Sequence, residues 1–305
     1  ALIDDHRDQR PDTPTADDLF RRLRGRDSLT IAHVGGRFAD MAYHDDRVEP
    51  AVEVHSAWGT FEWILFDALK LGYRVGVVCN SDGHKCRPGA SYPGAASFGS
   101  YGGLTCLLAE GLTRDAVFDA IRARHCYGTT GARIDLDVAL RDGDGRCLAG
   151  MGDVIKRHGR GAVTLAVSVL GTAAVERVDV FNGARRIATR RPSLPDGAAP
   201  SVKVITAGAE VRGRARRVEG EGTLRVTGAK IRGAQFINFH NPERAASRTS
   251  PGRITWRGVT TGGVQGVLLD LDGHRGKARL DTSRAEAVAS IEELTMKPRV
   301  WRAGG

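Results

Sequence analysis

The stretch of residues 75–85 constrains the fold of this chain more than any other. A short apolar run, residues 75–79, gives way at once to the polar sequence Asn80-Ser81-Asp82-Gly83-His84. In an extended backbone, residues i and i+2 lie on the same side, so Asp82 and His84 are predicted to face one place. Such a pair at the carboxyl end of a buried strand can supply half of the ligands of a divalent metal site. The alternative interpretation is a polar turn that closes the strand, with His84 solvated.

The same pattern occurs twice more, earlier in the chain. Residues 29–32 form an apolar run that ends in His33, and residues 51–56 contain Glu53 and His55 at i, i+2 spacing. Functional groups gather at the carboxyl ends of parallel strands in open sheets and barrels. Three neighbouring strand ends rich in His, Asp and Glu therefore predict a common site.

Helical signals separate these candidate strands. Thr60 is predicted to cap a helix with apolar positions at helical spacing, and Gly72 suits the residue after its end. Thr113 is predicted to cap a second helix. Strands that alternate with helices indicate an α/β domain.

Several ordered motifs resemble one known superfamily. They are His33-Val34-Gly35-Gly36-Arg37, residues 53–62, residues 80–85, residues 102–105, Thr113-Arg114-Asp115 and residues 127–131. Together they resemble the PHP (polymerase and histidinol phosphatase) superfamily, and more closely its branch of large proteins with a C-terminal β-rich domain.

The resemblance implies a distorted β/α barrel that holds divalent metals at its strand ends and hydrolyses phosphoesters. By this resemblance, His33, Asp82 and His84 are metal ligands. Glu53 and His55 are either further ligands or residues that contact ligands or substrate. Imidazole and carboxylate ligands suit Zn, Mn or Fe better than Ca.

One departure from the superfamily pattern concerns its opening strand, which carries His-x-His. No two histidines of this chain are spaced i, i+2. We therefore expect the chain to begin partway through the barrel, to contain only its late strands, and to need a complementary N-terminal segment or chain. On its own it is expected to bind metal weakly and to turn over poorly.

Charged residues near the strand ends suggest how a substrate is bound. Arg37, Lys85 and Arg87 follow ligand-bearing ends and are predicted to receive a small anionic ester, or else to be solvated loop charges. His44 is predicted to be a general acid or a further ligand, and the alternative is an ordinary loop histidine.

The pattern changes near residue 132. Residues 134–140 alternate between apolar and polar, and Asn182-Gly183 between two apolar runs is a strong hairpin signal. Many short strands with frequent turns indicate a β-sandwich. The expected organisation is a PHP-like β/α domain over residues 1–131 and a β-sandwich domain over residues 132–305.

Composition narrows the functional classes. A hydrophobic fraction of 41% without a long apolar segment predicts a soluble protein with no membrane partner, whether cytoplasmic or exported. The net charge of +9 is spread through both halves, so specific nucleic-acid binding is not expected. The sequence thus favours a metal-dependent hydrolase of phosphoesters or related anionic esters. The alternative is a non-catalytic ligand-binding or assembly module with a degenerate half-barrel.

Overall fold

The first part of the chain is built on a parallel sheet. The computed structural model describes residues 15–34, 39–83, 102–156, 161–192, 200–207, 218–237, 239, 246–260, 264–296 and 298–302. Strand β2 (Ala51–Ser56) pairs in parallel with β1 (Ile31–Ala32) on one side and with β4 (Gly76–Cys79) on the other. The short β3 (Gly59–Thr60) folds back antiparallel on the end of β2. All six residues of β2 are buried, as expected for the central strand.

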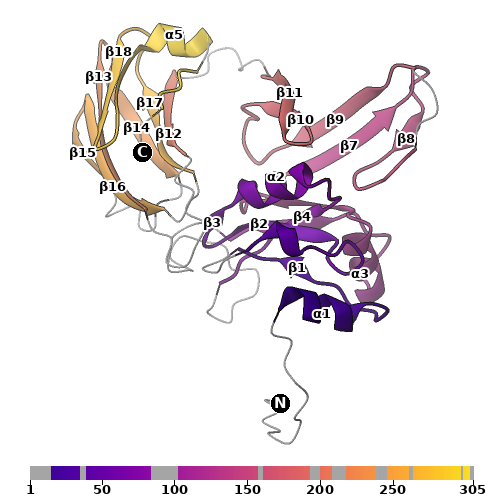
Figure 1. The fold of residues 1–305 in the computed structure, drawn as a ribbon. Coiled ribbons are helices and arrows are strands. Elements are labelled where there is room, and N and C mark those ends of the chain that lie inside the picture. Colours follow the sequence, from indigo (N-terminus) through magenta and orange to yellow (C-terminus); the bar gives the residue numbers. More distant parts are fainter. Residues whose placement is uncertain are drawn as a thin grey trace, which may run out of the picture.

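Helices accompany this sheet (Figure 1). They are α1 (Ala16–Leu23), the 3-10 turn η1 (Met41–Tyr43), α2 (Glu62–Lys70) and α3 (Arg114–Arg122). Helix α2 packs on β2, with Ile64 and Ala68 in one core with Val52 and Val54. This core holds α2 against β2.

The two predicted helix caps have different outcomes. Thr113 is confirmed as the cap of α3, because its hydroxyl accepts the backbone N–H of Ala116 at 3.1 Å. The prediction for Thr60 is wrong. Phe61 is the residue before α2 and makes no side-chain cap, while the Thr60 hydroxyl lies 2.7 Å from Nδ1 of His55.

An antiparallel pair, β5 (Leu104–Leu107) and β6 (Cys126–Thr129), lies beside β4. A side chain joins it to β4. Thr105 Oγ1 accepts the N–H of Cys79 at 3.0 Å and donates to the Cys79 carbonyl at 2.8 Å. The described strands of this part form a four-stranded sheet and this pair, and they do not close into a barrel.

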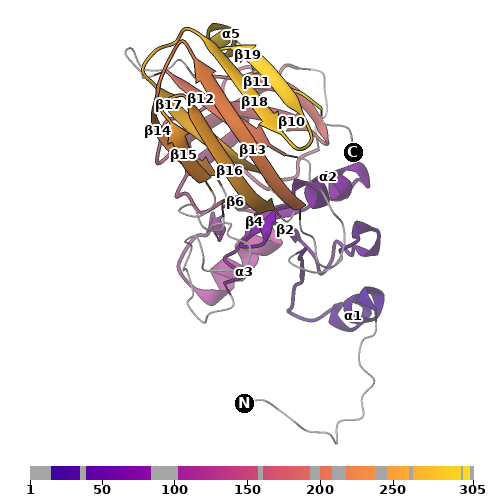
Figure 2. The ribbon, with the colours of Figure 1, turned by 90° about the vertical axis from the view of Figure 1, so that its left-hand side faces the viewer.

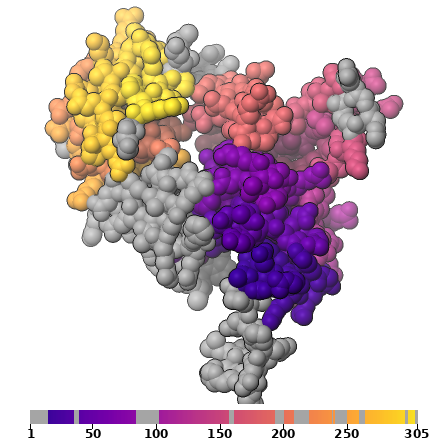
Figure 3. Space-filling model, viewed as in Figure 1, coloured from indigo at the N-terminus to yellow at the C-terminus, as the bar shows by residue number. Residues whose placement is uncertain are grey.

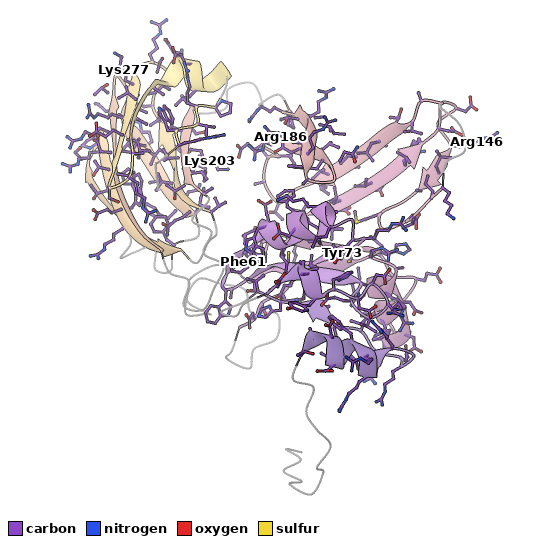
Figure 4. The ribbon with its side chains drawn as sticks, in the orientation of Figure 1. Phe61, Tyr73, Arg146, Arg186, Lys203 and Lys277 are labelled. Carbon is purple, nitrogen blue, oxygen red and sulfur yellow. The ribbon has the colours of Figure 1, made fainter. Side chains whose placement is uncertain are left out.

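After β6, the described residues up to 190 form strands and turns but no helix. Strands β7 (Asp135–Arg141), β8 (Cys147–Ala149) and β9 (Thr164–Leu170) form a sheet in the order β8-β7-β9. Arg146 marks its far tip in Figure 4. Strands β10 (Val178–Asn182) and β11 (Arg185–Arg190) form the predicted hairpin, with Gly183 at φ 58° in its turn. The ring of Phe181 in this hairpin lies 5.6 Å from the ring of Phe66 in α2.

The last part consists of two sheets that face each other around one core (Figures 1 and 2). One sheet has the order β12-β17-β14, with β12 (Ser201–Thr206), β17 (Gln265–Leu271) and β14 (Ile231–Ile237). The other has the order β15-β16-β13-β18-β19, with β15 (Ala246–Ser250), β16 (Arg253–Thr260), β13 (Val218–Thr227), β18 (Lys277–Thr282) and β19 (Glu286–Ser290). Leu269 and Ile231 from the first sheet meet Leu224 and Ile254 from the second in the core, which the short helix α5 (Ile291–Met296) helps to close.

The coarse prediction of an α/β part followed by a β-rich part is therefore confirmed. Figure 3 shows the described residues of the first part, in indigo and purple, and those of the last two sheets, in orange and yellow, on different regions of the surface. Among the described residues after α3, strands predominate and α5 is a short helix near the end, while the exact domain boundary at residues 131 and 132 stays a prediction. Within the described residues, no helix has the length and apolarity needed to cross a membrane.

Candidate functional site

Three acidic or imidazole side chains meet at the carboxyl ends of the parallel strands. His33 directly follows β1, Glu53 lies in β2, and Asp82 comes three residues after β4. His33 Nδ1 contacts Oε2 of Glu53, and His33 Nε2 lies 3.6 Å from Oδ2 of Asp82. The structure thus brings together groups that the sequence placed at three separate strand ends.

Glu53 is held from both sides. Its second oxygen, Oε1, accepts a hydrogen bond from Nδ2 of Asn80 at 2.7 Å. The side chain of Glu53 is only 7% exposed, whereas that of His33 is 40% exposed. The group therefore combines a buried carboxylate, that of Glu53, with an imidazole, that of His33, which solvent or a ligand can reach.

Asp82 adopts an unusual backbone conformation. Its φ is 44°, in the left-handed region, which non-glycine residues enter at a cost of roughly 1–2 kcal/mol. The preceding segment is fixed on both sides, because Asn80 N–H donates to the His55 carbonyl at 3.0 Å and the Asn80 carbonyl accepts Gly103 N–H at 2.8 Å. Such anchoring is what keeps a strained residue in place, and strained residues cluster at functional sites.

Two glycines allow this anchoring. A Cβ on Gly102 would lie 2.7 Å from Cα of Ser81, and one on Gly103 would lie 2.6 Å from Cβ of Cys79. Any larger residue would push the start of β5 away from the segment that carries Asp82.

His55 is buried near the end of β2, on the same strand as Glu53. It is 1% exposed, and its Nδ1 lies 2.7 Å from the hydroxyl of Thr60 in the β2–β3 hairpin. The pairing of β2 with β4 shifts register between Glu53 and His55, so simple alternation does not fix their relative direction. The roles predicted for His55, as a further ligand or as a contact of a ligand or substrate, stay predictions.

His44 lies apart from this group. Its Nδ1 is 2.8 Å from Oε2 of Glu49, and its ring centroid is 4.3 Å from that of Tyr73, which Figure 4 labels. Glu49 precedes β2 and Tyr73 precedes β4, so this cluster belongs to the amino ends of the strands. The side chain of His44 is 1% exposed. The structure therefore does not bring the predicted general acid to His33 and Asp82.

Four predicted site residues, Arg37, His84, Lys85 and Arg87, lie outside the described residues. Within the described ranges, no group of three or more His, Cys, Asp or Glu side chains is arranged to hold a metal ion. The full ligand set therefore remains a prediction.

Burial determines the chemistry of the Cys79 thiol, at the end of β4. Burial raises the pKa of Cys79 to about 12, and the negative charge of Glu53 contributes in the same direction. Cys79 is thus a neutral packing residue at ordinary pH and does not supply a thiolate nucleophile.

Sequence reasoning missed Asn80 as a contact of Glu53. The only signal was its position as the first polar residue after the apolar run of β4. The roles of Gly103 and Thr105 were also missed, because their contacts connect residues more than twenty positions apart.

Comparisons with known proteins add one finding. The model of a family described as "Protein of unknown function (DUF3604)" matches residues 80–140. The matched stretch includes Asn80, Asp82, Gly103 and Thr105, but neither His33 nor Glu53. No curated protein and no solved structure matches the chain.

Proposed function

We propose that this protein is a metal-dependent hydrolase of phosphoesters or related anionic esters, in which His33 and Asp82, together with His84, hold a divalent cation. The observation that carries the proposal is the approach of His33 Nε2 to Asp82 Oδ2, at 3.6 Å, beyond the ends of β1 and β4, the two parallel strands that flank β2. In this proposal the α/β part corresponds to the late strands of a PHP-like barrel.

The donor set suits such a cation. Zinc binds His nitrogen and carboxylate oxygen at about 2.0–2.2 Å, so two ligands at a tetrahedral angle are roughly 3.3 Å apart. The separation of 3.6 Å between His33 and Asp82 is close to that value. Imidazole with carboxylate also suits manganese and iron.

Each residue has a defined task in this proposal. Asp82 supplies negative charge and His33 a neutral nitrogen, and the open side of His33 gives a ligand access. A divalent cation held there would polarise the ester and lower the pKa of the attacking water. Arg37, Lys85 and Arg87 are proposed to bind the anionic group of the substrate, on the basis of their positions in the sequence.

Metal content and activity on generic phosphoesters test this proposal. The purified chain is loaded in turn with Zn²⁺, Mn²⁺ and Fe²⁺ and assayed on p-nitrophenyl phosphate and bis(p-nitrophenyl) phosphate, with and without chelator. Asp82→Asn is the sharpest variant, because Asn tolerates the left-handed backbone and removes only the charge. Its rate should fall by more than the roughly 10–100-fold that changes around a metal's ligands cost.

Asp119→Asn is the matched control, since Asp119 lies on α3 with a side chain 72% exposed. It should retain metal content and rate. Equal activity of the wild type, Asp82→Asn and chelated protein would refute the proposal.

A further inference from the structure

We propose that Glu53 and Asn80 are positioning residues. In this view Asn80 holds the Glu53 carboxylate, and Glu53 holds the His33 ring so that Nε2 is the nitrogen offered to the cation. The identity of the bound ion rests on the proposed function, whereas the arrangement of the three side chains does not. The proposal resolves the open role of Glu53 in favour of orientation rather than ligation.

The first step concerns the two nitrogens of His33. A neutral imidazole carries one N–H donor and one lone pair, and a carboxylate only accepts. Because Glu53 Oε2 contacts Nδ1, the proton belongs on Nδ1 and the lone pair on Nε2. Nε2 is also the atom that lies 3.6 Å from Asp82. A histidine that donates its second nitrogen to a carboxylate is the usual arrangement behind a metal ligand.

The second step concerns Glu53 itself. One of its oxygens contacts His33 and the other accepts from Asn80, so both are engaged. The side chain is 7% exposed and extends from the central strand β2. Glu53 therefore contacts the imidazole from the buried side, while Asp82 lies near its other nitrogen, Nε2.

The third step concerns Asn80. Its backbone N–H and carbonyl are both hydrogen-bonded, to His55 and Gly103 respectively, so its side chain starts from a fixed point. Since an ionised carboxylate has no donor, the contact of 2.7 Å with Glu53 assigns the amide nitrogen to that side. Because the Asn80 amide is uncharged, it neither neutralises nor repels the Glu53 carboxylate. It can therefore hold that buried charge in place by a hydrogen bond alone.

Two nearly isosteric variants separate orientation from ligation. Glu53→Gln keeps the shape and removes the charge, and Asn80→Asp replaces the donor with a second carboxylate against Glu53. Glu286→Gln on β19, with a side chain 73% exposed, and Asn182→Asp, at the last residue of β10, are the matched controls.

The first readout is the tautomer of His33, from long-range ¹H–¹⁵N correlation spectra of the metal-free chain at a pH where the ring is neutral. We expect the Nδ1–H form in the wild type and in both controls, and a mixture of tautomers in Glu53→Gln and Asn80→Asp. An Nε2–H form in the wild type, or an unchanged tautomer in both variants, overturns the proposal. This measurement needs neither metal nor activity.

The second readout is Zn²⁺ affinity by calorimetry. Both variants should still bind the ion, with affinity reduced by about 10–100-fold, whereas Asp82→Asn should lose more. If Glu53→Gln loses the ion as completely as Asp82→Asn, Glu53 is a ligand and the positioning role is wrong. Failure of the wild type to bind any ion rejects the proposed function, while the tautomer still decides the role of Glu53.

Discussion

Gly103→Ala tests whether the close packing under the Asp82 segment is as tight as the structure indicates. The added Cβ would lie 2.6 Å from Cβ of Cys79 and 2.9 Å from the backbone nitrogen of Asn80. Neither neighbour is the end of a flexible side chain, so the start of β5 must move outward. Overpacking of this kind typically costs about 1–3 kcal/mol.

The displacement also weakens hydrogen bonds between β5 and β4. Gly103 N–H donates to the Asn80 carbonyl at 2.8 Å, and the hydroxyl of Thr105 bonds both backbone groups of Cys79. Each such bond is worth roughly 0.5–1.5 kcal/mol net. We therefore expect Gly103→Ala to lower the free energy of unfolding by about 2–4 kcal/mol.

Urea unfolding followed by circular dichroism measures this loss, with Gly111→Ala as the control. A Cβ on Gly111 would meet nothing within 4 Å, and its φ is not in the left-handed range. The control should be neutral or stabilise the protein by up to about 1 kcal/mol. If the free energies of unfolding of Gly103→Ala and of the control differ by less than about 0.5 kcal/mol, the packing argument fails.

Three further predictions follow from the same part of the chain. In the native protein at pH 8, the buried Cys79 thiol should resist Ellman's reagent while the exposed Cys147 reacts, because burial raises the pKa of Cys79 to about 12; rapid modification of Cys79 in native protein would contradict this. Hydrogen bonds from Arg47 hold the pKa of Asp45 at about 2, below its ordinary value, so the stability it contributes is present above about pH 4 and lost as the pH falls towards 2. Asp45→Asn should remove this dependence of stability on pH. The contribution to stability is about 1 kcal/mol, because Arg47 is exposed and solvent screens its interaction with Asp45. Thermal unfolding as a function of pH measures it. Thr105→Val keeps the shape but leaves both Cys79 backbone groups without this partner, and should cost about 1–3 kcal/mol in urea unfolding; a loss near zero would show that the hydroxyl does not join the strands.

The features that the sequence predicts well are those set by neighbouring residues or by strand direction. The meeting of His33, Glu53 and Asp82 follows from the rule that parallel strands align their carboxyl ends. The cap at Thr113 and the turn at Gly183 follow from the local chemistry of hydroxyls and glycines.

Features that depend on distant contacts are not predictable in this way. The hydroxyl of Thr60 suits a helix cap by composition, yet the hairpin of β2 with β3 directs it to His55 instead. His44 looks like a site residue in sequence, but Glu49 and Tyr73 hold it at the opposite ends of the strands. The bulge after Glu53 likewise depends on the pairing of β2 with β4, which a single strand does not reveal.

Strand β9 has consequences for how the protein behaves at high concentration. It lies at one end of its sheet, where one row of its backbone groups faces no other described strand, and its sequence Thr-Leu-Ala-Val-Ser-Val-Leu carries no charge. Exposed uncharged edges of this kind recruit further strands from other molecules, which proteins usually prevent with a lysine or a proline. Light scattering should therefore rise with concentration sooner for the natural chain than for one with lysine in place of Val167, whose side chain is 37% exposed.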